Sequence, residues 1–127
     1  MTIQTLEKPF SVCKLPFDKA AACKKDFKYA FFSCTDGDCS LICPSDAVPE
    51  GVTERNDGWR ALRVQPPVNM EMVGVLLDLS KIFAGVEVSV LPVGTYDTVY
   101  FLLRSDGYMK ALQALTENGY KVEIAYL

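Results

Sequence analysis

The hydrophobic and polar positions from residue 59 onward follow two clear periods. Residues 59–65 alternate between two faces, as a strand does, and Pro66-Pro67 ends the run because proline cannot donate to a sheet ladder. Residues 70–84 repeat their apolar positions every three or four residues, which predicts an amphipathic helix with Asn69 as its N-cap. The apolar face of this helix consists of Met72, Val73, Leu76, Leu79, Ile82 and Phe83.

The remaining residues predict two strands, a helix and a closing strand. Residues 87–93 and 98–104 are rich in β-branched and aromatic side chains, and a final helix follows Ser105 or Asp106. Gly119 is placed to end that helix in a left-handed conformation, and residues 122–126 alternate as a strand. This order predicts an α+β fold with a ferredoxin-like βαββαβ sheet and both helices on one face.

The first half of the chain carries weaker signals. Residues 10–15 predict a short strand, and Asp18 could start two helical turns over residues 18–25. Residues 29–34 and 39–43 predict a hairpin, because the connection between them is polar and contains glycine.

A loop is expected over residues 45–57, which contain Pro49, Gly51 and several charges. This loop is the best candidate for a domain boundary. We therefore predict an abbreviated unit over residues 1–57 and a complete unit over residues 58–127.

Composition limits the possible functions. Half of the 127 residues are apolar and the net charge is −3, which argues against a general nucleic-acid binder. No apolar run is long enough for a membrane span, and the N-terminus lacks the pattern of a signal peptide. These features predict a cytoplasmic protein with neither nucleic acid nor membrane as partner.

The five cysteines are Cys13, Cys23, Cys34, Cys39 and Cys43. An odd number fits free thiols in a reducing compartment, so buried thiols acting as small apolar side chains are expected. Two of them, Cys34 and Cys39, could face each other across the predicted hairpin, and a disulfide or redox switch there is the alternative. Their spacing does not match a zinc site.

Catalytic chemistry has little support in the sequence. The chain has no histidine, the commonest general base, and it carries neither a glycine-rich phosphate loop nor a nucleophile elbow. Its paired carboxylates, such as Asp36 with Asp38, lie in turn-like segments. We predict no catalytic residues, no metal site, no cofactor and no enzyme activity.

Four sequence runs resemble a known family of small tandem ACT-domain proteins, related to the ACT pairs of cytosolic arginine sensors and of aspartate kinases. The runs are residues 58–64, which include Trp59-Arg60-Ala61-Leu62, Gly74-Val75-Leu76 in the first predicted helix, residues 94–98, which include Thr95-Tyr96-Asp97-Thr98, and the hairpin over residues 35–43 with its acidic turn Thr35-Asp36-Gly37-Asp38. The resemblance covers residues 10–126 and implies two ACT-like units in tandem, the first of them abbreviated.

The resemblance further implies that a small ligand, typically an amino acid, binds at an interface between ACT units. In such domains the contacts come from the loop before the first helix and from the adjacent strand. The matching positions here are Asn69, Met70, Glu71, Gly74, Thr95, Tyr96, Asp97 and Thr98. Val99 stands where the family tends to carry a second acid. Three alternatives follow: Asp97 or Glu71 holds the ligand cation, the pocket prefers a different ligand, or the pocket has lost its ligand.

These positions suit a free amino acid chemically. Unpaired amides at a helix start can bind a carboxylate, and Asp97 can hold an ammonium group. The alternative is purely structural: Asn69 caps the helix, Gly74 permits close packing and Asp97 shapes a turn.

Two functional hypotheses follow from this reading. One is a non-enzymatic regulatory protein that binds an amino acid and forms a homodimer. The other is an interaction module whose ACT-like sheets pair without a ligand.

Overall fold

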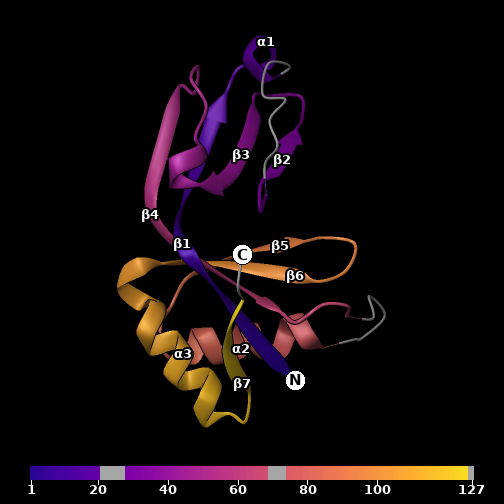
Figure 1. Cartoon of the computed structure of the whole chain (residues 1–127), viewed down its shortest axis with the longest axis vertical. Coiled ribbons are helices and arrows are strands. Elements are labelled where there is room, and N and C mark those ends of the chain that lie inside the picture. The colour runs from indigo at the N-terminus through magenta and orange to yellow at the C-terminus, as the bar shows by residue number, and fades with distance from the viewer. Residues whose placement is uncertain (21–27, 69–73, 126–127) are drawn as a thin grey trace. The chain divides into compact units, whose positions relative to one another are not determined.

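A computed structural model describes residues 1–20, 28–68 and 74–125 of the protein (Figure 1). The fold is mixed α+β, and the strands outnumber the helices among these residues. In chain order the elements are β1 (Thr2–Leu15), α1 (Phe17–Ala20), β2 (Phe31–Cys34), β3 (Cys39–Pro44), a 3-10 turn (Ser45–Ala47), β4 (Glu54–Val64), α2 (Val75–Gly85), β5 (Val90–Gly94), β6 (Val99–Arg104), a second 3-10 turn (Ser105–Gly107), α3 (Tyr108–Glu117) and β7 (Lys121–Ala125). None of the described helices is long and apolar enough to cross a membrane.

The chain divides into two compact units. One contains Met1–Glu7 together with Arg60–Leu127, and the other contains Lys8–Trp59. Strands β1 and β4 each contribute residues to both units. The assignment of residues 1–57 to an ACT-like unit of their own stays a prediction.

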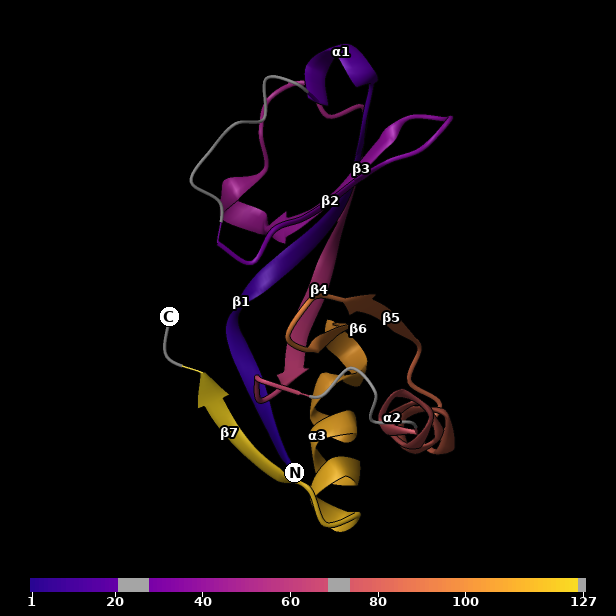
Figure 2. The same ribbon diagram turned by 90° about the vertical axis from the view of Figure 1, so that its right-hand side faces the viewer.

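In the larger unit, the N-terminal part of β1 is a strand of the sheet, which was not expected from the sequence. The strands follow the order β7-β1-β4-β6-β5, and Thr2–Leu6 pair in parallel with β7. On the other side of β1, the Gln65 amide donates to the Thr2 carbonyl over 2.9 Å. In a self-contained βαββαβ sheet the closing strand lies beside the first strand of that unit. Here β1 lies between β7 and β4 (Figure 2). The strand that was expected to start at residue 10 begins eight residues earlier, at Thr2.

Helices α2 and α3 lie on the same face of this sheet (Figure 2), as predicted. Leu79 and Phe83 of α2 are fully buried, and the Phe83 ring meets Phe101 of β6 edge-on at a centroid distance of 5.4 Å. Leu76 was expected on the buried face of α2 but is 47% exposed. The core that the helices share with the sheet includes Ile3, Leu62, Val64, Leu103, Ala111 and Leu115.

In the smaller unit the strands follow the order β2-β3-β1-β4. The predicted hairpin is confirmed, because β2 and β3 pair antiparallel from Phe31 opposite Ile42 to Cys34 opposite Cys39. The predicted loop is wrong over residues 54–57, which open strand β4. Of the predicted helix over residues 18–25, α1 is described to Ala20, and residues 21–27 lie outside the described part.

The cysteines of this unit correct one expectation. Cys34 and Cys39 form a disulfide across the hairpin, instead of remaining as thiols. Cys13 and Cys43 do behave as small apolar core residues, buried beside Leu41, and Cys23 lies outside the described residues. Cys34 and Cys39 therefore give no support to the expectation of free thiols in a reducing compartment.

Candidate functional site

The predicted site falls at the start of α2 and on the turn between β5 and β6. Asn69, Met70 and Glu71 lie outside the described residues. Gly74 precedes α2 in a left-handed conformation, with φ at 97°, so α2 begins at Val75. The expectation that Gly74 sits one turn inside a helix is wrong, because a left-handed residue interrupts a right-handed helix.

Glycine at position 74 could serve close packing of the helix against the sheet, or it could allow a positive φ. A Cβ atom placed on it would meet no atom within 4 Å among the described residues. Close packing of helix against sheet is therefore not why glycine stands here. The positive φ is sufficient reason for a glycine at this position.

The turn between β5 and β6 carries the other four predicted residues. The Thr95 hydroxyl donates to the Thr98 carbonyl over 3.0 Å and accepts from the Thr98 amide over 3.2 Å. Thr98 is buried, and its hydroxyl donates to the Val64 carbonyl over 2.6 Å. These bonds fix the turn against the end of β4.

One backbone hydrogen bond joins the segment before α2 to the β5–β6 turn. The Val68 amide donates to the Asp97 carbonyl over 2.7 Å. The segment that leads toward α2 therefore lies directly against the turn. The Asp97 side chain is exposed and Tyr96 is 85% exposed, so both reach solvent from the rim of this region.

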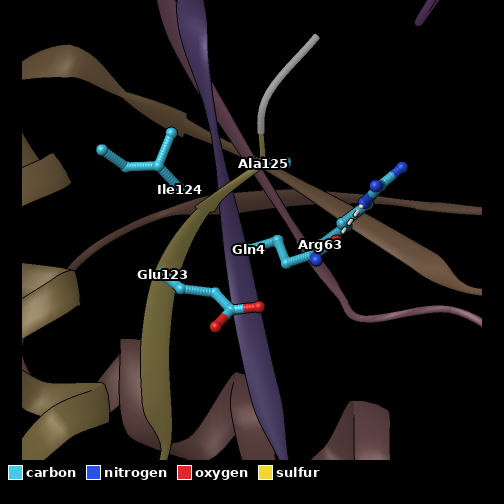
Figure 3. A pocket seen from close by; sticks show the side chains of 5 residues that line it. All are labelled: Gln4, Arg63, Glu123, Ile124 and Ala125. Carbon is cyan, nitrogen blue, oxygen red and sulfur yellow. Dashed lines mark hydrogen bonds between the residues drawn. The ribbon is translucent and has the colours of Figure 1, made fainter.

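A pocket of about 450 Å³ lies at the edge of the sheet of the larger unit, where no site was expected from the sequence. Gln4, Arg63, Glu123, Ile124 and Ala125 line it, and they come from three neighbouring strands (Figure 3). Positions 4, 63 and 123 are so far apart in the chain that no motif connects them. Arg63 lies in a predicted strand that also contains Arg60, so its charge did not mark it as a site residue.

The Arg63 guanidinium is held from two sides. Its Nε donates to Gln4 Oε1 over 2.9 Å, and its Nη1 donates to the Tyr100 hydroxyl over 3.0 Å. The guanidinium carbon also lies 5.8 Å from the centre of the Tyr100 ring, within cation–π range. The pocket therefore contains a positioned cation.

A second hollow of about 360 Å³ lies between α3 and β7. In it, Arg60 stacks over the Tyr108 ring at 4.2 Å and pairs with Glu7 over 2.6 Å. Burial raises the pKa of the Tyr108 hydroxyl above its ordinary value, since desolvation disfavours the phenolate. Within the part of the chain that the structure describes, no three metal-binding side chains gather into a metal site.

Comparison with solved structures identifies the fold. A structural-genomics target protein from Agrobacterium tumefaciens matches with a TM-score of 0.84 at 20% identity, over 99% of this chain and 94% of that one. A Vibrio cholerae protein of unknown function, described as a possible transport protein, matches with a TM-score of 0.72 at 14% identity, over 91% and 88%. The ligand-free regulatory subunit of aspartate kinase from Thermus thermophilus matches with a TM-score of 0.67 at 7% identity, over 92% and 96%.

A search of curated proteins finds no match to this chain. The sequence pattern that defines the ACT domain matches residues 54–117, which run from the start of β4 to the end of α3. That match covers half of the chain, and the solved structures share the same fold. The chain belongs to the ACT-domain family.

Proposed function

We propose that the protein is a non-enzymatic regulator that binds an amino acid between the start of α2 and the β5–β6 turn. The ligand carboxylate would meet backbone amides near Gly74, and its ammonium group would meet the Asp97 carboxylate. Thr95, Tyr96 and Thr98 would shape the turn side of the site, and Asn69, Met70 and Glu71 the helix side. The protein would act in the cytoplasm, without a cofactor or metal, and as a homodimer of tandem ACT-like units.

The observation that carries this proposal is the Val68 to Asp97 hydrogen bond. It supports the proposal because it places the segment before α2 beside the turn that bears Asp97. The Asp97 side chain is exposed, and a Cβ atom on Gly74 would meet no described atom within 4 Å, which is compatible with a ligand at either position. Membership of the ACT family and the likeness to an aspartate kinase regulatory subunit point the same way.

Thermal-shift measurements against the twenty amino acids test the proposal. A ligand at 100 times its dissociation constant adds about 2.7 kcal/mol to stability, which is readily measured. Asp97→Ala should abolish the shift for the amino acid that binds. Asp36→Ala, which removes another exposed carboxylate, from the β2–β3 turn, is the matched control and should leave the shift intact.

Failure would be equally clear. If no amino acid raises the melting temperature, or if Asp97→Ala and Asp36→Ala behave alike, the proposed site is wrong.

A pairing module without a ligand is the second candidate, and the edge strand β7 favours it. Strand β7 pairs with β1, and the sheet order gives it no second partner among the described strands. An unpaired edge can add a strand from another chain. On the opposite edge, β5 carries Pro92, which discourages pairing there. A homodimer by light scattering that no amino acid alters would favour this candidate, and a monomer would exclude it.

A further inference from the structure

We propose that two copies of the chain pair antiparallel along β7, with Val122 on the twofold axis and Lys121 opposite Glu123 of the second copy. This inference rests on the homodimer proposed above, and it names the strand and the register that form it. It shares no residue with the proposed amino-acid site, so the two proposals can fail separately.

Strand β7 has one open side. It is the outermost strand of the sheet in the larger unit (Figure 2), and no described strand pairs with its other side. The Lys121 amide donates to the Met1 carbonyl of the neighbouring chain segment over 3.3 Å. Successive residues of a strand direct their backbone groups alternately to its two sides. The backbone groups of Lys121 and Glu123 therefore face β1, and those of Val122 and Ile124 face the open side.

This alternation limits the registers that a second β7 can adopt. In an antiparallel pair, two directly opposed residues either exchange both of their hydrogen bonds or exchange none. Outward-facing residues must therefore lie opposite outward-facing residues of the second copy. A register shifted by one residue would set the outward groups of one copy against residues whose groups are already bonded to β1.

Charge selects one of the remaining registers. With Val122 on the twofold axis, Lys121 lies opposite Glu123 of the second copy, and symmetry repeats this pair on the other side of the axis. An axis at Lys121 or at Glu123 would set two like charges directly opposite each other, which destabilises a strand pair. An axis nearer either end of β7 shortens the ladder and forms no pair between Lys121 and Glu123.

The two charged side chains are available for such pairs. The Lys121 and Glu123 side chains are 74% and 36% exposed, and Nζ lies 3.6 Å from Oε2 within one chain. An exposed pair of this kind contributes little free energy, so each side chain can turn to the second copy at small cost. A lysine alone on an edge strand discourages pairing, but lysine and glutamate two residues apart complement themselves in an antiparallel pair.

The opposite face of β7 carries apolar side chains that a single chain leaves uncovered. Ile124 is 46% exposed and Met109 of α3 is 71% exposed. Together with Leu112 and Val122 they line the hollow of about 360 Å³ between α3 and β7. In the proposed register Ile124 lies opposite Tyr120 of the second copy, so this face gains an apolar partner.

The position of α3 suits the same pairing. Thr5 of β1 and Ile124 of β7 both line the hollow beside α3, so this helix lies along these two strands. Pairing through β7 then separates α3 from its counterpart in the second copy by about two strand spacings, or about 10 Å. Packed helices lie about 8–10 Å apart, so the two α3 helices meet and cover Met109 and Leu112.

Charge reversal tests the register. Lys121→Glu sets glutamate opposite glutamate on both sides of the axis, and Glu123→Lys sets lysine opposite lysine. Each variant should dimerise about tenfold more weakly than the original protein, or more weakly still, because both symmetry-related pairs become repulsive. Sedimentation equilibrium of the whole protein measures the dissociation constant, at low ionic strength because salt screens exposed charges.

An equimolar mixture of the two variants provides the sharpest measurement. A copy with two glutamates complements a copy with two lysines at both pairs, so the mixture should form a heterodimer about as tightly as the original homodimer. Lys81→Glu, which reverses an exposed charge on α2, is the matched control and should leave dimerisation unchanged.

A proline variant tests the pairing without any change of charge. Val122→Pro removes an outward amide that β1 does not use, and proline is tolerated at such positions of edge strands. This variant should abolish dimerisation, and it decides the question if a charge-reversed variant fails to fold.

Three results would overturn the inference. These are a monomeric original protein, a dimer that neither charge reversal weakens, and a mixture that fails to recover the dimer. A dimer that is indifferent to both reversals would leave the homodimer proposed above intact and exclude only β7 as its interface. A monomer would exclude both, while the Asp97→Ala measurement would still decide the amino-acid site.

Discussion

Thr98, on the turn of the proposed amino-acid site, is hydrogen-bonded to strand β4. The substitution Thr98→Val measures what this hydrogen bond contributes to the free energy of unfolding. The Thr98 side chain is 8% exposed, and its hydroxyl donates to the Val64 carbonyl over 2.6 Å. Valine keeps the branched shape and removes the donor, so a buried carbonyl loses a hydrogen-bond partner. A typical bond of this kind contributes about 1 kcal/mol, and leaving its buried partner unsatisfied adds to the cost, so we expect a loss of about 1–2 kcal/mol.

Urea unfolding provides the measurement. The free energy of unfolding should fall by that amount at an unchanged m-value, because the surface exposed on unfolding hardly changes. The melting temperature should fall by about 4 °C for each kcal/mol in a chain of this size.

Thr95→Val is the matched comparison on the same turn. The Thr95 hydroxyl is only partly buried, and both of its bonds stay within the turn, at 3.0 Å and 3.2 Å. Its loss should cost less than that of the Thr98 hydroxyl. The reasoning is refuted if Thr98→Val is as stable as the original protein, or if Thr95→Val is the more destabilised of the two.

Three further predictions concern the core, the acid range and a helix end. Phe83→Ala should cost about 3–5 kcal/mol in denaturant unfolding, because it leaves a cavity against Phe101; a loss below about 1 kcal/mol would mean that α2 does not pack there. The Ser11 hydroxyl, donating to Asp57, holds the pKa of that carboxyl below its ordinary value of 3.8. A depressed pKa stabilises the fold above the ordinary pKa, and this contribution disappears as the pH falls through the folded-state pKa. Ser11→Ala should therefore destabilise the protein more near neutral pH than at about pH 2, and a difference that does not depend on pH would count against it. Gly119 has φ at 89° with open space around it, so Gly119→Ala should cost about 1 kcal/mol from backbone strain alone; an unchanged melting temperature would show that the helix ends without that conformation.

Local pattern was a sufficient guide to most elements of the second half. The period of three to four residues predicted α2 and α3, and Gly119 was expected to end α3 in a left-handed conformation, as it does. The β5–β6 turn was also predictable, because polar residues separate two strongly β-prone runs. These features depend on residues within one or two turns of each other, which a single sequence displays directly.

The start of α2 shows where local pattern misled. Apolar spacing continues smoothly through residues 70–84, and nothing in it marks an interruption. The positive φ at Gly74 delays the described helix to Val75. Glycine tolerates both helical and left-handed angles, so its conformation follows from what the surrounding chain requires.

The sequence by itself determined the order of helices and strands from β4 onward, the ACT family of the chain and the turn that carries Asp97. Only the tertiary structure decided that Thr2–Leu6 lie between β7 and β4, that Cys34 is joined to Cys39, and that Gln4, Arg63 and Glu123 line one pocket. The physical reason is the sequence separation of the residues that interact. Periodicity and helix capping depend on residues that are close together along the chain. Strand pairing brings together residues more than a hundred positions apart, and it depends on which edge of the sheet is open when the whole chain has packed.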